Sequence, residues 1–215
     1  MHLSEILSID KEKLGEACGI FAGAGGLYYG GKKCVLEIRV GRGEREYLEK
    51  IVKPLFESTF PLEFKRVKRF YQDGYVLGIR CCGRRAERIF HTLLEFPIGR
   101  KSGNLHVPKI IRNNMDYWKA YIRGFFDTRG TVYSRVTRKK YKSMVLEMRS
   151  PSLIHLIEIR EMVNDLGFKF WLEKGNYKIR MAGKRNVERF FKDINPHNNA
   201  KWEKYRKFVL RWPRG

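Results

Sequence analysis

An internal duplication constrains this chain most, because two copies of one unit must fold alike and then pack together. The segment CVLEIRV at residues 34–40 recurs as MVLEMRS at 144–150, and CGRRAERIF at 82–90 recurs as AGKRNVERFF at 182–191. DGYVLGIR at 73–80 parallels GNYKIR at 175–180. The matches keep their order at a nearly constant spacing. The sequence therefore predicts two similar halves.

Each half is predicted to contain the same elements in the same order. A helix ending at a glycine (Gly25, Gly130) precedes two strands, an amphipathic helix, two further strands and a last helix. We expect both glycines to be left-handed, the conformation that stops many helices. The predicted fold is α+β, with duplicated αββαββα halves, pseudo-two-fold symmetry and two antiparallel sheets. The expected boundaries are 1–96, a Gly/Pro/Ser-rich linker at 97–115, and 116–215.

Charge gives a second constraint. The chain has 45 Lys and Arg against 23 Asp and Glu, a formal net charge of +22, and a pI near 10.0. Such a balance favours a polyanionic partner, with nucleic acid as the default. The cations lie within strand-like segments such as EFKRVKRF and YKIRMAGKR rather than in tails. We therefore expect the partner to lie across a folded surface; a solvated basic surface without a partner is the alternative.

Membrane and metal signals are weak. No apolar run is long enough to suggest a membrane helix, and the first residues lack the apolar region of a signal peptide. We therefore expect an intracellular protein without a membrane partner. The five histidines and four cysteines are scattered without ligand spacing, so no metal site is predicted from them.

Alternation along the strands assigns side chains to the two faces of each sheet. Leu36 and Ile38 are expected to face the helices, which leaves a polar, basic outer face. The residues expected on the outer face are Tyr28, Lys32, Val35, Glu37, Arg39 and Arg80 in the first half, and Tyr133, Arg135, Glu147, Arg149, Lys178 and Arg180 in the second. Arginines there would read guanine edges and glutamates cytosine amino groups. Phosphate contacts are expected from the turn lysines Lys32, Lys33, Lys139 and Lys140.

The two glycine-ending helices resemble the paired motifs of the LAGLIDADG homing endonucleases, at residues 18–25 and 123–130, and the resemblance covers nearly the whole chain. In that family the two motif helices cross at the centre of a pseudosymmetric monomer, and the sheets form a saddle over the DNA major groove. The resemblance implies a monomeric, sequence-specific double-stranded DNA-binding protein, cytoplasmic and DNA-associated. The family's activity is metal-dependent double-strand cleavage at an intron or intein target.

Small residues recur every four positions along both motif helices. They are Gly15, Gly19 and Gly23 in the first helix and Ala120, Gly124 and Thr128 in the second. Each interior Gly costs a helix about 0.5–1 kcal/mol relative to Ala. The resemblance implies that this cost is offset by close approach of the two helix backbones, so we expect these six residues to form the seam between the halves.

The chain departs from the family at the positions that matter for cleavage. The family's penultimate motif residue is an acid, one from each helix, and the two acids hold Mg²⁺ for hydrolysis. Counting along the motif places Ala24 and Arg129 there. Neither supplies a carboxylate, and Arg is a permanent cation. We expect cleavage to be lost and no cofactor to be needed. Substitutions introduced to trap an enzyme on DNA would explain Ala24 readily and Arg129 poorly.

Three alternatives remain open at this point. An active homing endonuclease would capture its metal with non-standard ligands, with Asp127 or another acid taking over the role. A maturase would bind intron RNA through the same basic saddle. A transcription regulator would use DNA binding alone.

Overall fold

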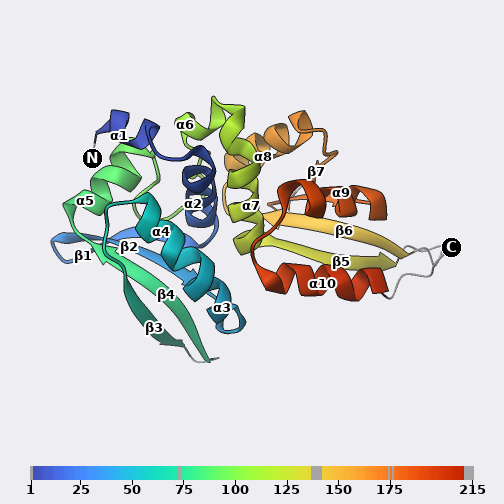
Figure 1. Ribbon diagram of the computed structural model, residues 1–215, viewed down its shortest axis with the longest axis horizontal. Coiled ribbons are helices and arrows are strands. Elements are labelled where there is room, and N and C mark those ends of the chain that lie inside the picture. Colours follow the sequence, from blue (N-terminus) through green and yellow to red (C-terminus); the bar gives the residue numbers. More distant parts are fainter. Residues whose placement is uncertain (1, 72–73, 137–141, 174, 176, 211–215) are drawn as a thin grey trace.

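Two four-stranded antiparallel sheets with the same strand order form the framework (Figure 1). The computed structural model describes residues 2–71, 74–136, 142–173, 175 and 177–210. The first sheet has the order β1-β2-β4-β3 and the second β5-β6-β8-β7. The strands are β1 (Gly25–Gly30), β2 (Lys33–Val40), β3 (Lys65–Tyr71), β4 (Gly74–Cys82), β5 (Gly130–Val136), β6 (Lys142–Arg149), β7 (Trp171–Glu173) and β8 (Lys178–Ala182).

Strand register shows that the halves fold alike. Glu37 pairs with Arg80 across β2 and β4, and Glu147 pairs with Arg180 across β6 and β8. These pairs lie in the repeated sequence segments, so equivalent residues occupy equivalent sheet positions. The predicted α+β fold with duplicated halves and two antiparallel sheets is confirmed.

The motif helices α2 (Lys11–Ala24) and α7 (Trp118–Arg129) lie side by side between the two sheets (Figure 1). The other helical segments surround this pair and the sheets. They are α1 (Leu3–Leu7), η1 (Arg42–Glu44), α3 (Arg45–Tyr47), η2 (Leu48–Val52), α4 (Lys53–Thr59), α5 (Arg84–Glu87), η3 (Arg88–Leu93), α6 (Lys109–Arg112), η4 (Met115–Tyr117), α8 (Leu153–Asp165), α9 (Lys184–Ile194) and α10 (Asn199–Leu210). Among the described residues, none of these helices is both long and apolar enough to cross a bilayer.

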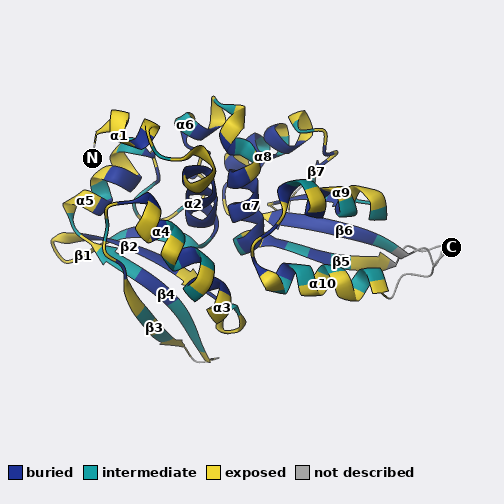
Figure 2. Cartoon of the chain, viewed as in Figure 1, coloured by how far each residue is buried: buried dark blue, intermediate teal, exposed yellow. Residues whose placement is uncertain are grey.

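Glycine lets the two central helices touch along their backbones. A Cβ atom on Gly19 would lie 2.0 Å from the backbone oxygen of Tyr121, and one on Gly124 would lie 2.3 Å from that of Glu16. A Cβ atom on Gly23 would lie 1.9 Å from the Thr128 hydroxyl. Both helices are almost entirely buried along this contact (Figure 2). Even an alanine at Gly19 or Gly124 would force the helices apart.

The glycines that follow α2 and α7 serve a different purpose from the expected one. Gly25 and Gly130 have extended backbones, with φ of −83° and −92°, so the prediction of left-handed residues is wrong. A Cβ atom on Gly25 would lie 2.1 Å from the Phe21 ring, and one on Gly130 would lie 2.0 Å from the Phe126 ring. Each glycine therefore makes room for a core phenylalanine directly beneath the helix-to-strand turn.

Aromatic side chains fill the core of each half. Phe21 packs against Phe90 with ring centroids 4.6 Å apart, and Phe126 packs against Phe190 at 5.1 Å. The last helix adds to the second core, because Tyr205 of α10 stacks on Phe191 at 4.3 Å. These ring contacts pack each central helix against another helical segment of its own half, α2 against η3 and α7 against α9.

Candidate nucleic-acid interface

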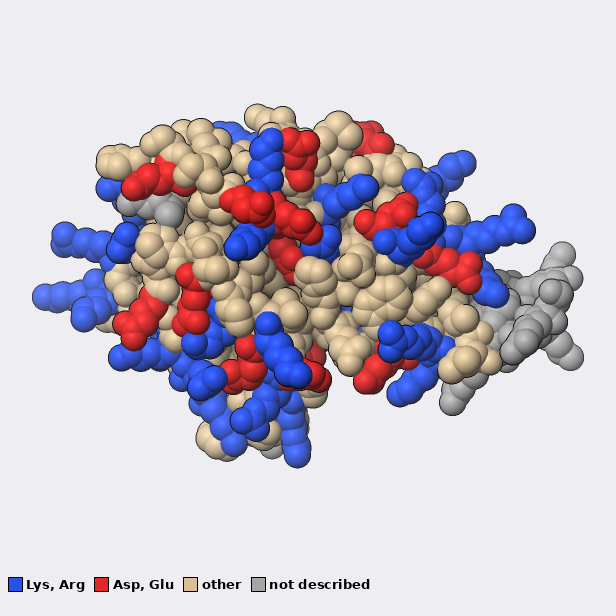
Figure 3. Space-filling view, viewed as in Figure 1, with Lys and Arg blue, Asp and Glu red and all other residues tan. Residues whose placement is uncertain are grey.

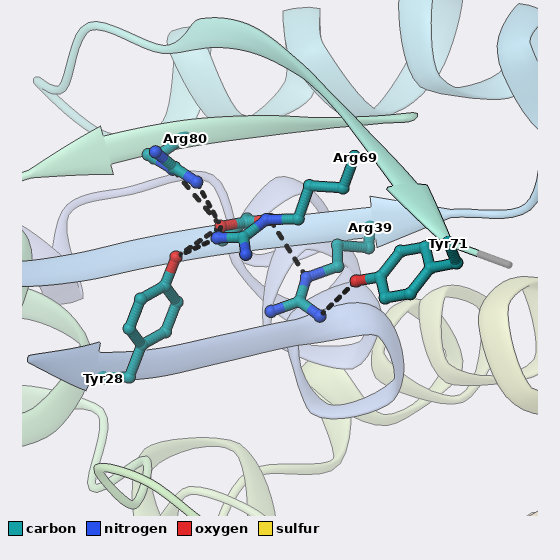
Figure 4. A network of polar contacts seen from close by, with 6 residues as sticks. Tyr28, Arg39, Arg69, Tyr71 and Arg80 are labelled. Carbon is teal, nitrogen blue, oxygen red and sulfur yellow. Dashed lines mark hydrogen bonds and ion pairs between the residues drawn. The ribbon is translucent and has the colours of Figure 1, made fainter. Parts of the chain in front are cut away.

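On the face of the first sheet away from its helices, one carboxylate gathers three arginines from three strands (Figure 4). Glu37 of β2 accepts hydrogen bonds from Arg69 Nε and NH2 at 2.8 and 2.7 Å, and from Arg80 NH2 at 3.0 Å. Arg39 Nε donates at 3.0 Å and the Tyr28 hydroxyl at 2.6 Å. We call these five residues the first arginine cluster.

The carboxylate at the centre of this cluster is charged. Burial alone would raise the pKa of Glu37, but the hydrogen bonds from Arg69, Tyr28 and Arg80 outweigh it and lower the pKa to about 2. The ionised carboxylate in turn holds the guanidinium groups in defined orientations. Such charge-assisted hydrogen bonds are shorter and stronger than neutral ones.

The second sheet carries an equivalent arrangement. Glu147 of β6 accepts hydrogen bonds from Arg180 Nε at 2.7 Å, from Arg149 Nε, and from the Tyr133 hydroxyl at 3.1 Å. The net effect again lowers the pKa of Glu147, although burial opposes the shift. Together with Lys178, these residues form the second arginine cluster.

Four residues predicted to present side chains on the outer face are instead buried: Val35, Glu37, Glu147 and Lys178. The Glu37 side chain is 0% exposed because its neighbours' cations cover it. Lys178 is enclosed because Glu173 lies 3.2 Å from its Nζ. The expectation that the glutamates accept hydrogen bonds from cytosine is therefore corrected: their oxygens already accept from the chain's own arginines and tyrosines.

The remaining predicted residues are placed as follows. Lys32, Lys33, Arg39, Arg135 and Arg149 are exposed, whereas Tyr28, Arg80, Tyr133 and Arg180 are half-buried. Lys139 and Lys140 lie outside the described residues. The sequence reasoning missed Arg69, although alternation along β3 places it on the same face as Lys65, which pairs with Arg80. Lys and Arg side chains gather over the region of β3 and β4 (Figure 3).

Ala24 and Arg129, which the sequence predicts at the positions of the family's metal-binding acids, line a pocket of about 390 Å³ below the ends of α2 and α7. Arg129 Nε donates a 2.6 Å hydrogen bond to the backbone oxygen of Gly23. Lys101 Nζ donates to the oxygens of Phe21 and Ala22 at 2.6 and 2.9 Å. Burial, together with the positive charge of Arg129, lowers the pKa of Lys101 to about 7.

The end of α7 has a similar contact. Lys201 Nζ donates a 2.8 Å hydrogen bond to the backbone oxygen of Gly130, and burial lowers its pKa. Cationic side chains therefore meet the carbonyl ends of both central helices, where the helix dipole favours positive charge.

The residues around this pocket do not suit a divalent metal ion. In the part of the chain that the structure describes, no group of three or more His, Cys, Asp or Glu side chains could hold one. Two carboxylates line the pocket, but Glu37 is bound by three arginines and Glu44 accepts a 2.8 Å hydrogen bond from Asn198. Asp127 is fully buried and accepts a hydrogen bond from the backbone nitrogen of His197. It is not among the residues lining the pocket.

Comparisons with known proteins decide the fold. No protein-family model and no curated protein matches the sequence. Among solved structures, the homing endonuclease I-WcaI bound to its DNA recognition sequence is similar with a TM-score of 0.61 and 14% identity, over 92% of this chain and 87% of that one. I-DmoI in complex with DNA and Mn gives a TM-score of 0.58 and 16% identity, over 86% and 96%. The chain has the LAGLIDADG homing endonuclease fold.

The LAGLIDADG fold is not limited to proteins named as endonucleases. Full-length DUF199/WhiA from Thermatoga maritima is similar with a TM-score of 0.57 and 11% identity, over 99% of this chain and 66% of that one. Since one fold can carry different functions, the activity must be argued from the site.

Proposed function

We propose that this protein is a member of the LAGLIDADG homing endonuclease family that binds double-stranded DNA in a sequence-specific manner and has lost cleavage. The two sheets would form the saddle over the major groove, with one half at residues 1–96, a linker at 97–115 and the other half at 116–215. The protein would act as an intracellular, DNA-associated monomer descended from an intron- or intein-encoded enzyme. The observation that carries this proposal is the pair of arginine clusters on equivalent faces of the two sheets.

The clusters suit base recognition in the major groove. Arg39, Arg69 and Arg80 keep 42%, 36% and 34% of their side chains exposed while Glu37 fixes their orientation. Guanidinium groups bind guanine O6 and N7 in a bidentate manner, which is the commonest specific contact in protein–DNA complexes. Exposed Lys32 and Lys33, at the β1–β2 turn, would bind phosphate.

Loss of cleavage follows from the residues at the pocket. In active family members, bound Mg²⁺ or Mn²⁺ supplies an activated water and stabilises the reacting oxygens. Ala24 offers no ligand, and the Arg129 guanidinium places a permanent positive charge where a dication would bind. Arg129 would instead neutralise a phosphate at the centre of the bound DNA.

Two measurements test the proposal. Duplex affinity should fall steeply with salt, with a slope of log K against log salt of about −0.9 per phosphate contacted, or beyond roughly −5 for six contacts. A library of duplex targets incubated with Mg²⁺ or Mn²⁺ and sequenced for breaks should show none above background. Affinity that is insensitive to salt would refute the DNA-binding surface, and chelator-sensitive, site-specific breaks would refute the loss of cleavage.

The affinity measurement repeated with a structured RNA, together with the cleavage library, separates the maturase and the active endonuclease from this proposal. Preference for a structured RNA over duplex DNA by an order of magnitude would support the maturase. Site-specific breaks would support an active endonuclease with non-standard ligands.

A further inference from the structure

The two arginine clusters are equivalent in position but differ in charge balance. In the first cluster three guanidinium groups share the single carboxylate of Glu37. In the second, Arg149, Arg180 and Lys178 share two carboxylates, Glu147 and Glu173. Two positive charges are therefore unbalanced in the first cluster and only one in the second.

The outer strands of the sheets cause this difference. Lys65 of β3 pairs with Arg80, and Trp171 of β7 pairs with Arg180, so Lys65 and Trp171 occupy equivalent positions. Counting along the strands then makes Glu173 the equivalent of Val67. β3 continues to Tyr71 and delivers Arg69 to Glu37, whereas β7 ends at Glu173.

Glu173 also pairs with cations of the second cluster, Lys178 and Arg180. Arg180 donates a hydrogen bond through Nε to Glu147 at 2.7 Å, and its NH1 forms an ion pair with Glu173 at 2.6 Å. Its side chain is only 13% exposed, and that of Lys178 only 11%. At the equivalent position, the only carboxylate that Arg80 contacts among the described residues is that of Glu37, through Nε and NH2, and its side chain is 34% exposed. In the part of the chain that the structure describes, Arg80 NH1 has no hydrogen-bond or ion-pair partner, whereas Arg180 is paired with two carboxylates.

We propose that the two halves read DNA unequally: the first arginine cluster selects guanine in one half-site, and Glu173 keeps the second cluster from matching that selection. Glu37 acts as a positioning residue that aims the arginines. This inference rests on the proposed DNA-binding function. Arg149, 64% exposed, supplies the second half with a less constrained contact.

Selection from a random duplex library with the full-length protein tests the inference, using Arg80→Ala and Arg180→Ala as a matched pair. The selected motif should carry most of its sequence information in one half, with guanine at its strongest positions. R80A should erase that guanine preference and reduce the ratio of specific to non-specific affinity about tenfold, in the range of one bidentate contact. R180A should change the ratio less than threefold.

Two carboxylate variants separate positioning from simple charge. Glu37→Gln should raise affinity for non-specific duplex, because a negative charge is lost, yet lower the specificity ratio, because the arginines lose their anchor. Glu173→Gln should free Arg180 and add base preference to the weak half of the motif. Thermal unfolding of all four variants identifies any that are misfolded. The ratio of specific to non-specific affinity is then compared among the variants that fold.

The outcomes distinguish unequal reading of the two half-sites from DNA binding itself. A motif with equal information in both halves, or equal losses for R80A and R180A, would overturn the inequality and leave DNA binding intact. Failure of the unmodified protein to enrich any duplex sequence would overturn both.

Discussion

Arg129 of α7 donates a hydrogen bond through Nε to the backbone oxygen of Gly23 in α2, at 2.6 Å, across the seam between the halves. Among the described residues it forms no ion pair with a carboxylate. One edge of the guanidinium is thus anchored to the other half, and the rest faces the pocket below the helices. This contact holds a cation of one central helix against the end of the other.

Replacing this cation should weaken DNA binding without creating an enzyme. We expect Arg129→Ala to reduce the magnitude of the salt slope by about 0.9, the value for one phosphate contact. No breaks should appear with Mg²⁺ or Mn²⁺, because the substitution removes repulsion but supplies no ligand. Affinity measured over a salt series gives the slope. The control variant is Arg206→Ala on α10, which removes the same charge far along the chain from the pocket. An unchanged slope would show that Arg129 does not meet phosphate.

Restoring two acids should restore metal binding. The double variant Ala24→Asp, Arg129→Asp places carboxylates at the ends of both central helices, and hard oxygen ligands are those that Mg²⁺ and Mn²⁺ prefer. Calorimetric titration with Mn²⁺ should detect binding to the double variant and none to the unmodified protein or to A24D alone. Equal heats for all three proteins would contradict the assignment of these positions.

The backbone contact between α2 and α7 should tolerate no side chain at its centre. Gly19→Ala and Gly124→Ala put a Cβ atom against backbone oxygen, so we expect each to lower the free energy of unfolding by about 3 kcal/mol. Gly43→Ala is the matched control: nothing lies within 4 Å of its Cβ position, and the change should stay within about 0.5 kcal/mol. Chemical denaturation measures all three. A loss at Gly19 no larger than at Gly43 would mean that the helices separate at little cost.

Buried Asp127 should make stability fall as pH rises through the weakly acidic range. Burial raises its pKa from 3.8 to about 7, despite hydrogen bonds from the backbone of His197 and from Asn198. Between these values the folded state binds more protons than the unfolded state. Stability is therefore greatest below the unfolded pKa, and it is lost as pH approaches the folded pKa. The maximum slope is about 1.4 kcal/mol per pH unit.

Asp127→Asn removes the titratable carboxyl group but keeps a side-chain oxygen that can accept the hydrogen bond from the backbone nitrogen of His197. We expect the stability of this variant relative to the unmodified protein, measured as the free energy of unfolding, to be higher at pH 8 than at pH 5. Denaturation at both pH values measures the difference. The ion pair of His197 with Glu16 is present in both proteins and cancels in the comparison. Parallel pH profiles would show that Asp127 is ionised throughout.

Much of the fold was determined by the sequence itself. The repeated segments, strand alternation and the four-residue spacing of glycines are local patterns, and local patterns specify element type and which face turns inward. They predicted the duplicated α+β fold, which the structure and its similarity to solved endonucleases confirm. The assignment of Ala24 and Arg129 to the family's metal-acid positions also comes from the sequence, because the motif aligns without gaps, and it stays a prediction.

Only the tertiary structure decided what surrounds each residue on the outer face. Alternation placed Glu37 and Arg80 there, but the burial of Glu37 depends on Arg69, which lies far along the chain and arrives through pairing of β3 with β4. Likewise, Glu173 reaches Arg180 only because β7 pairs with β8. A period of two residues assigns a side chain to a face, whereas its charge partners are set by strand order and register between distant segments.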